Sequence, residues 1–273
     1  MSVSVASTAI KAYASGSTIV IDKPTGLAVG DLMVALVHKD DGNVGTCSLT
    51  GWTAIDSYDD SAISGDYMFS LYKIADSADA AASNFTFTLG ETKVTGGAIL
   101  RITGFNNIAP INQHGVGTDG TSNTSVVFSA GAVTPTENCL IIFAIFEDAG
   151  AITNSAYAIT NNNPSWTEVV DQSDGSNVTM AVAWAYRPEL TSTGNYSATA
   201  SSSTRAVGFL IAIGNAVVEV NDIVTVSDIT PISSPTLTTS ETITVTDELE
   251  DISANNWTNQ SKNSSVWTNT TKN

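Results

Sequence analysis

Acidic side chains gather at several points of the sequence and have the greatest scope for chemistry in it. The acidic clusters are Asp40-Asp41 with Asn43, Asp56 with Asp59-Asp60, Glu147-Asp148, and Asp171 with Asp174. Two converging carboxylates can hydrolyse a glycosidic bond, and a set of oxygen ligands can hold calcium. No cluster has the ligand spacing of a known calcium loop, so the sequence favours solvated loop charges over catalysis or calcium binding.

Histidine, the most frequent general acid or base, occurs only at His38 and His114. His38 ends a predicted strand and His114 lies in a predicted loop, so both are expected at the surface. The sequence contains no G-x-S-x-G, H-E-x-x-H, P-loop or G-x-G-x-x-G motif. We therefore predict no catalytic residues, no metal or cofactor site, and a protein that is not an enzyme.

Three aromatic residues beside the acidic clusters suggest another kind of chemistry, the stacking of sugar rings. They are Trp52, Tyr58 and Trp166. Exposed above the acidic loops, such rings would offer an apolar face to a sugar. A carbohydrate-binding module or a host-surface adhesin is therefore the alternative function.

The segments around the first and third of these aromatics indicate a duplication. Trp52 precedes Tyr72-Lys73 by the same number of residues as Trp166 precedes Tyr186-Arg187. Alternating patterns make any two all-β halves look alike, but this joint spacing of tryptophan and a tyrosine-basic pair favours a true repeat.

The match extends beyond the tryptophans, with different spacing in the loops. Asp31–Leu36 corresponds to Asn138–Phe143, and the second copy carries additional residues between positions 149 and 164. Spacing that changes only in loops rich in Gly, Asn, Asp and Ser is typical of a repeated set of strands.

Composition and periodicity predict an all-β fold. The chain is rich in Ser, Thr and Val and poor in the straight-chain residues that helices favour. Val178–Tyr186 alternates large side chains with threonine and alanine, so one face should lie in a core and the other against a neighbouring sheet. We predict a duplicated jelly-roll-like β-sandwich, with residues 1–105 as the first sandwich repeat and 106–216 as the second.

The character of the chain changes after residue 216. Val224–Asp228 and Ile243–Asp247 repeat a single short strand, so residues 217–255 are predicted to form an extended, strand-forming linker. Residues 256–273 repeat a Trp-Thr-Asn motif and are predicted to be a docking tail that lies across another subunit. The alternative is a flexible tail with two incidental aromatics. The predicted subunit-docking residues are Trp257, Asn259, Lys262, Trp267, Asn269 and Lys272.

Charge limits the partners that this chain is expected to have. The net charge is −17 with only 10 basic residues, so a phosphate backbone would be repelled and no direct nucleic-acid binding is expected. No apolar run approaches the roughly 18 residues of a membrane span, and no secretory signal is visible. Free thiols in a reducing cytoplasm are therefore favoured for Cys47 and Cys139, although the sequence leaves a disulfide open.

A series of short motifs runs through the first copy and into the second. It consists of GDLMVALV (Gly30–Val37), GWT (Gly51–Thr53), YKIADSAD (Tyr72–Asp79), FTFTL (Phe85–Leu89), GGAILRITGF (Gly96–Phe105) and PIN (Pro110–Asn112). This order resembles a domain that recurs in virion proteins of tailed bacteriophages. The resemblance implies a virion structural protein (tail fibre, tail tip or capsid decoration), assembled in the host cytoplasm and held in the particle by its C-terminal arm. It also implies other virion proteins as partners and a homo-oligomer, with a trimer favoured, and it carries over no active-site residue. A host-surface glycan is a further expected partner if the protein is a receptor-binding fibre.

Overall fold

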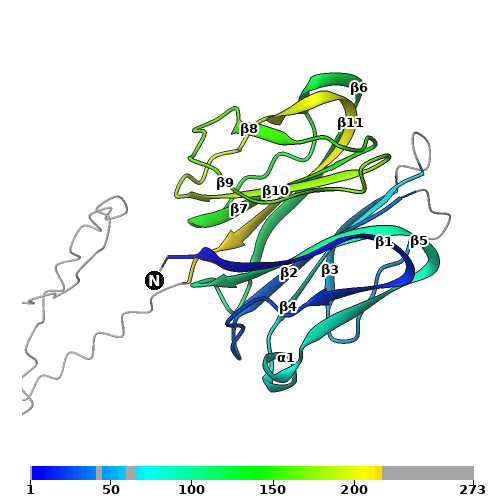
Figure 1. The fold of residues 1–273 in the computed structure, drawn as a ribbon. Coiled ribbons are helices and arrows are strands. Elements are labelled where there is room, and N and C mark those ends of the chain that lie inside the picture. The colour runs from blue at the N-terminus through cyan, green and yellow to red at the C-terminus, as the bar shows by residue number, and fades with distance from the viewer. Residues whose placement is uncertain (1, 41–44, 60–64, 217–273) are drawn as a thin grey trace, which may run out of the picture. The chain divides into compact units, whose positions relative to one another are not determined.

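The computed structural model describes residues 2–40, 45–59 and 65–216 of the chain. Their elements are β1 (Ser4–Asp22), β2 (Leu32–Lys39), β3 (Thr53–Asp59), β4 (Tyr67–Ile74), α1 (Ser77–Ala81), β5 (Asn84–Thr103), β6 (Ile111–Phe128), β7 (Cys139–Glu147), β8 (Asn154–Ile159), β9 (Thr167–Ser173), β10 (Thr179–Arg187) and β11 (Tyr196–Gly214). The predicted all-β class is confirmed, and Figure 1 shows the strands gathered in two layers. The predictions for 217–255 and 256–273, with the docking residues Trp257, Asn259, Lys262, Trp267, Asn269 and Lys272, lie outside the described residues.

Each copy of the repeat forms one antiparallel sheet with the same strand order. The first sheet runs β1-β5-β2-β4-β3 and the second runs β6-β11-β7-β10-β9. Corresponding strands therefore occupy corresponding places, as a duplication predicts. The second sheet has one extra strand, β8, which pairs with β11 and lies within the additional residues of the second copy.

The longest strands of each sheet bend back over their own sheet. β1 and β5 pair over nearly their whole length, with register shifts between Lys11 and Ala14 and between Gly16 and Thr18. Such irregularities bend a strand and increase its twist. Beyond the shifts, Ile19 and Phe87 join Met33 in one buried cluster, the outer core of the first copy. Residues of β6, β7 and β11 form an equivalent outer core in the second copy.

The two sheets pack against each other through a third cluster, the shared core. In β2 the side chains of Leu32, Val34 and Leu36 enter the shared core, whereas Met33 and Val37 enter the outer core. Both faces of the strand are thus buried, which explains why it reads as a continuous apolar run.

The cores into which the two faces of β2 are buried correct the sequence alignment of β2 with β7. The sequence pairs Met33 with Leu140, but Met33 belongs to an outer core and Leu140 to the shared core. Because side chains alternate along a strand, a one-residue shift moves a residue to the opposite face. The equivalents of Met33 are therefore Cys139 or Ile141, which belong to the outer core of the second copy.

The two copies contact each other reciprocally. β1 lies against β9, and β3 lies against β6. Since β6 corresponds to β1 and β9 to β3, exchanging the copies exchanges these two contacts, as in the isologous interface of a two-fold dimer. Residues 1–220 accordingly form one compact unit, and this packing places the outer core of each copy on the side away from its partner copy.

Candidate functional site

The three aromatic residues predicted to stack on sugars have different surroundings. Trp52 packs edge-on against Phe85 and Phe87, with ring centroids 5.7 and 5.1 Å away, in the outer core of the first copy. Tyr58 is half-buried against the shared core. Trp166 alone of the three lines the open pocket described next, so the structure does not bring the predicted trio together.

The pocket beside Trp166, called the Trp166 pocket below, has a volume of about 530 Å³. Its lining residues are Asn154, Ser155, Ala156, Tyr157, Asn163, Pro164, Trp166 and Glu168. Most of them belong to β8 and the loop that follows it, between positions 149 and 164, where the second copy is longer. The first copy has a shorter segment here, in which the isolated bridge between Ser48 and Thr88 takes the place of the pairing between β8 and β11.

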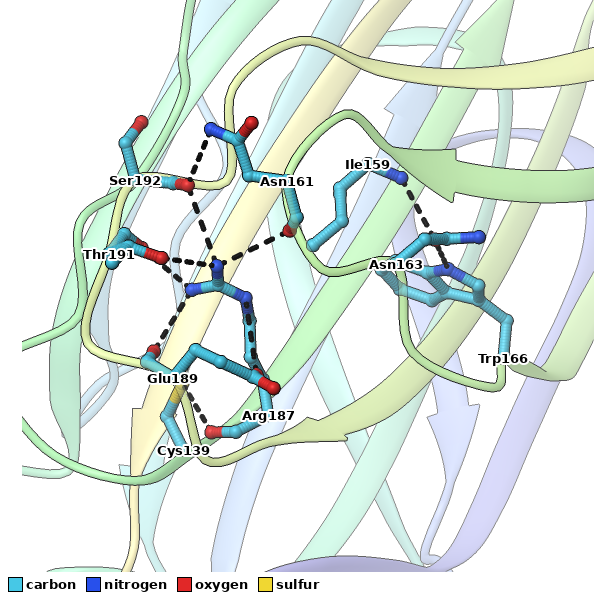
Figure 2. Close-up of polar contacts among 9 residues, drawn as sticks. All are labelled: Cys139, Ile159, Asn161, Asn163, Trp166, Arg187, Glu189, Thr191 and Ser192. Carbon is cyan, nitrogen blue, oxygen red and sulfur yellow. Dashed lines mark hydrogen bonds and ion pairs between the residues drawn. The ribbon is translucent and has the colours of Figure 1, made fainter.

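Hydrogen bonds fix the indole ring in this pocket. The side-chain oxygen of Asn163 accepts from the indole Nε1 of Trp166 at 2.9 Å and from the backbone N–H of Ile159 at 3.0 Å (Figure 2). Trp166 also packs against Phe143 and Tyr157, at centroid distances of 6.0 and 6.4 Å. The ring is thereby held in place before any ligand binds, which reduces the entropy lost on binding.

A buried arginine supports the loop that carries Asn163. Arg187, at the end of β10, has no exposed surface. Its guanidinium donates to the carbonyl oxygens of Thr191 at 2.7 Å and Glu189 at 3.0 Å, and more weakly to that of Asn161 at 3.4 Å (Figure 2). Because the guanidinium group presents several donors in a fixed planar fork, this one side chain joins the loop after β8, which carries Asn161, to the loop after β10, which carries Glu189 and Thr191.

The residue that matches Arg187 in the first copy has another role. Lys73 forms ion pairs with Asp76 at 3.1 Å and with Asp79. These two aspartates make the capping box at the start of α1. The sequence alignment matches Lys73 with Arg187, but Arg187 is buried and joins two loops, whereas Lys73 binds the aspartates that cap α1.

Below the pocket lies a buried carboxylate that the sequence placed in a solvated loop. Glu147, the last residue of β7, is fully buried, and its Oε2 accepts from the side-chain amide of Asn154 at 2.8 Å. The expectation of a solvated charge is wrong here because Glu147 is paired in the sheet, with Thr179 on one side and Ala206 on the other. Burial raises the pKa of Glu147 to about 7, the Asn154 hydrogen bond opposes this, and the charge of Asp171 adds to it.

The neighbouring titratable groups show the same negative electrostatic environment. The pKa of Asp171 is raised by burial and by the charge of Glu168. The pKa of the Tyr157 phenol is raised well above its ordinary value by burial, and then by Glu168, Asp171 and Glu147. The charge of Glu168 therefore acts on both Asp171 and Tyr157 beside the pocket.

Buried polar atoms at the pocket have unused hydrogen-bonding capacity. The side-chain oxygen of Asn154 and Oε1 of Glu147 are buried and have no hydrogen-bond partner among the described residues. Buried polar atoms are usually satisfied, so such a group beside an open pocket points to a ligand that satisfies it. A fixed aromatic ring, side-chain amides and carboxylates together suit a polyhydroxylated ligand with an apolar face.

The two histidines differ from each other in burial. His114 is exposed and pairs with Asp56 at 2.6 Å, as expected of a surface residue, but it lies in β6 and not in the predicted loop. The surface expectation for His38 is wrong, because His38 lies between β4 and β5 in the sheet and is fully buried. Its Nδ1 hydrogen-bonds with the hydroxyl of Tyr13 at 2.7 Å, and its ring contacts Phe146 across the shared core.

Other predictions concern cysteines, metals and membranes. Cys47 and Cys139 are free thiols that lie in different outer cores, which settles the alternative of a disulfide between them. In the described part of the chain, no group of three or more His, Cys, Asp and Glu side chains is placed to hold a metal ion. Nor do those residues include a helix long and apolar enough to cross a membrane.

Comparison with protein-family models, with curated proteins and with solved structures gives no match for this chain.

Proposed function

We propose that this chain is a non-enzymatic structural protein of a tailed-bacteriophage particle, of the tail-fibre, tail-tip or capsid-decoration type, and that its second copy binds saccharide. Two features support the structural role: the order of strand motifs from Gly30 to Asn112, and a duplicated body in which two sheets share one core. Such a body is a rigid platform on which a loop can carry recognition.

The observation that carries the saccharide function is the Trp166 pocket. Its aromatic ring is held by Asn163, and the side-chain oxygen of Asn154 is left without a partner. The corresponding Trp52 lies beside a shorter segment, in which Ser48 forms an isolated bridge with Thr88, and it packs into the outer core of the first copy. Saccharide recognition and a structural role in the particle are compatible, because a receptor-binding fibre performs both.

Replacing Trp166 with Ala is expected to weaken saccharide binding about 30-fold, the loss of about 2 kcal/mol typical of a central aromatic anchor. A glycan array with the full chain selects the saccharide, and calorimetry measures its affinity. Trp52→Ala is the matched control, because it removes the equivalent ring from the first copy and should leave affinity unchanged. An array without any bound saccharide, or equal affinity of the Trp166→Ala variant, would contradict the saccharide function.

Deleting residues 256–273 is expected to leave a folded body but abolish incorporation into particles, because this segment is proposed to dock on another subunit. The truncated gene is supplied to a phage that lacks the full-length copy, and purified particles are assayed for the protein. Thermal unfolding of the isolated truncated protein controls for folding. Incorporation at the level of the full chain would remove the docking role.

A further inference from the structure

We propose that the Trp166 pocket selects saccharide units that carry a free amine over neutral and anionic units. This inference rests on the saccharide function proposed above and names the ligand class of the same site. The residues that line the pocket provide the first support for it. They include Glu168 and two asparagines, and no lysine, arginine or histidine is among them.

Negative charge around the pocket is not balanced by a lining cation. Glu168 lies at the pocket, and Asp171 is close enough to Glu168 for the charge of Glu168 to raise the pKa of Asp171. Two neighbouring carboxylates gain from a positive charge placed beside them. An ammonium group on the ligand supplies that charge, whereas an anionic sugar would add to the repulsion.

The orientation of Asn154 makes the pocket floor an acceptor of hydrogen bonds. The amide nitrogen of Asn154 donates to Oε2 of Glu147 at 2.8 Å. The amide oxygen is then left for other partners, and it has none among the described residues. Since Asn154 is only 5% exposed, this oxygen represents buried acceptor capacity at the pocket. An ammonium group offers three donors to such a site.

The aromatic rings favour the same ligand. Trp166 and Tyr157 lie at a centroid distance of 6.4 Å and both line the pocket. A cation over the face of a tryptophan or tyrosine is attracted by the ring quadrupole. The sugar ring can therefore stack on an aromatic face while its ammonium group remains close to Glu168.

The test uses the full chain and three trisaccharides of equal length, measured by calorimetry at pH 6.5 and moderate salt. One is built of glucosamine, one of N-acetylglucosamine and one of galacturonate. The glucosamine trimer is expected to bind at least about 10-fold more tightly than the N-acetylated trimer, a difference of about 1.4 kcal/mol, and the galacturonate trimer is expected not to bind. Glu168→Gln should remove the preference for the amine, so that the glucosamine and N-acetylated trimers bind this variant with equal affinity.

The outcomes separate this inference from the function on which it rests. If the N-acetylated or galacturonate trimer binds as tightly as the glucosamine trimer, the selectivity is wrong and saccharide binding stands. If the glucosamine trimer binds Trp166→Ala as tightly as the unaltered chain, the attraction is a general one to an acidic surface, and the inference is overturned. If neither these trimers nor any saccharide on the glycan array binds, the proposed saccharide function itself fails.

Discussion

Replacing Arg187 with Met is expected to lower the free energy of unfolding by about 3 kcal/mol. The variant keeps most of the aliphatic volume but removes the donors that satisfy the carbonyl oxygens of Thr191 and Glu189. A hydrogen bond from a charged donor contributes about 1.5–3 kcal/mol, and two strong bonds of this kind and several weaker ones are lost. Urea unfolding followed by tryptophan fluorescence measures the change.

Lys73→Met is the matched control for this prediction, because it removes the corresponding basic residue of the first copy. Its ion pair with Asp76 is partly exposed, and the buried Asp79 still accepts from the backbone N–H of Asp76, so a smaller loss of about 1 kcal/mol is expected. Since Arg187 also bonds to the loop before Trp166, its replacement should weaken saccharide binding, and that of Lys73 should not. Equal losses of unfolding free energy in Arg187→Met and Lys73→Met would show that the hydrogen bonds of Arg187 do not contribute more to stability than the ion pairs of Lys73.

Replacing Glu147 with Gln is expected to stabilise the protein by about 3 kcal/mol at pH 8 and hardly at all at pH 4. Burial raises the pKa of Glu147 from 4.5 to about 7, so the folded state holds this proton more tightly than the unfolded state does. The ionised side chain therefore destabilises the fold, a penalty that is absent below about pH 4.5 and complete above about pH 7. A shift of this size corresponds to about 3 kcal/mol.

The difference between the unaltered chain and the Glu147→Gln variant is the quantity to measure, by urea unfolding at several pH values. Glutamine still offers an oxygen to the Asn154 amide, so the hydrogen bond at that oxygen is retained. Glu168→Gln is the control, because Glu168 is exposed and its replacement should give no comparable pH-dependent gain. A stability difference that is the same at pH 4 and pH 8 would contradict the assigned role of Glu147.

Much of the fold follows from the sequence because the alternation of large and small side chains along a strand indicates which face is buried in which core. Val178–Tyr186 was predicted to put large side chains on one face, and Met180, Val182 and Trp184 do lie in or against the shared core, with Ala181 and Ala183 on the opposite face. Gly97 permits a close backbone approach in β5, since a Cβ there would lie 2.9 Å from the carbonyl oxygen of Leu36.

The candidate site was less predictable, because its residues differ between copies that look alike. Trp52 and Trp166 have the same sequence context, but the longer segment of the second copy, which forms β8, lines the pocket of Trp166. The greater length of that segment, with Tyr157 and several asparagines, was the signal that could have identified the site. Nothing local to Arg187 or His38 indicates burial, because each owes its surroundings to strands or loops far away in the sequence.

The central claim, that the second copy recognises saccharide at Trp166, is tested most directly by the indole N–H signals in a nuclear magnetic resonance titration. The chain has 5 tryptophans, and single Trp→Phe variants assign their signals. Titration with the glucosamine trisaccharide is expected to shift the Trp166 signal strongly and to leave the Trp52 signal in place. A saturating shift at Trp52, or no shift at Trp166 with any saccharide that the chain binds, would contradict the claim.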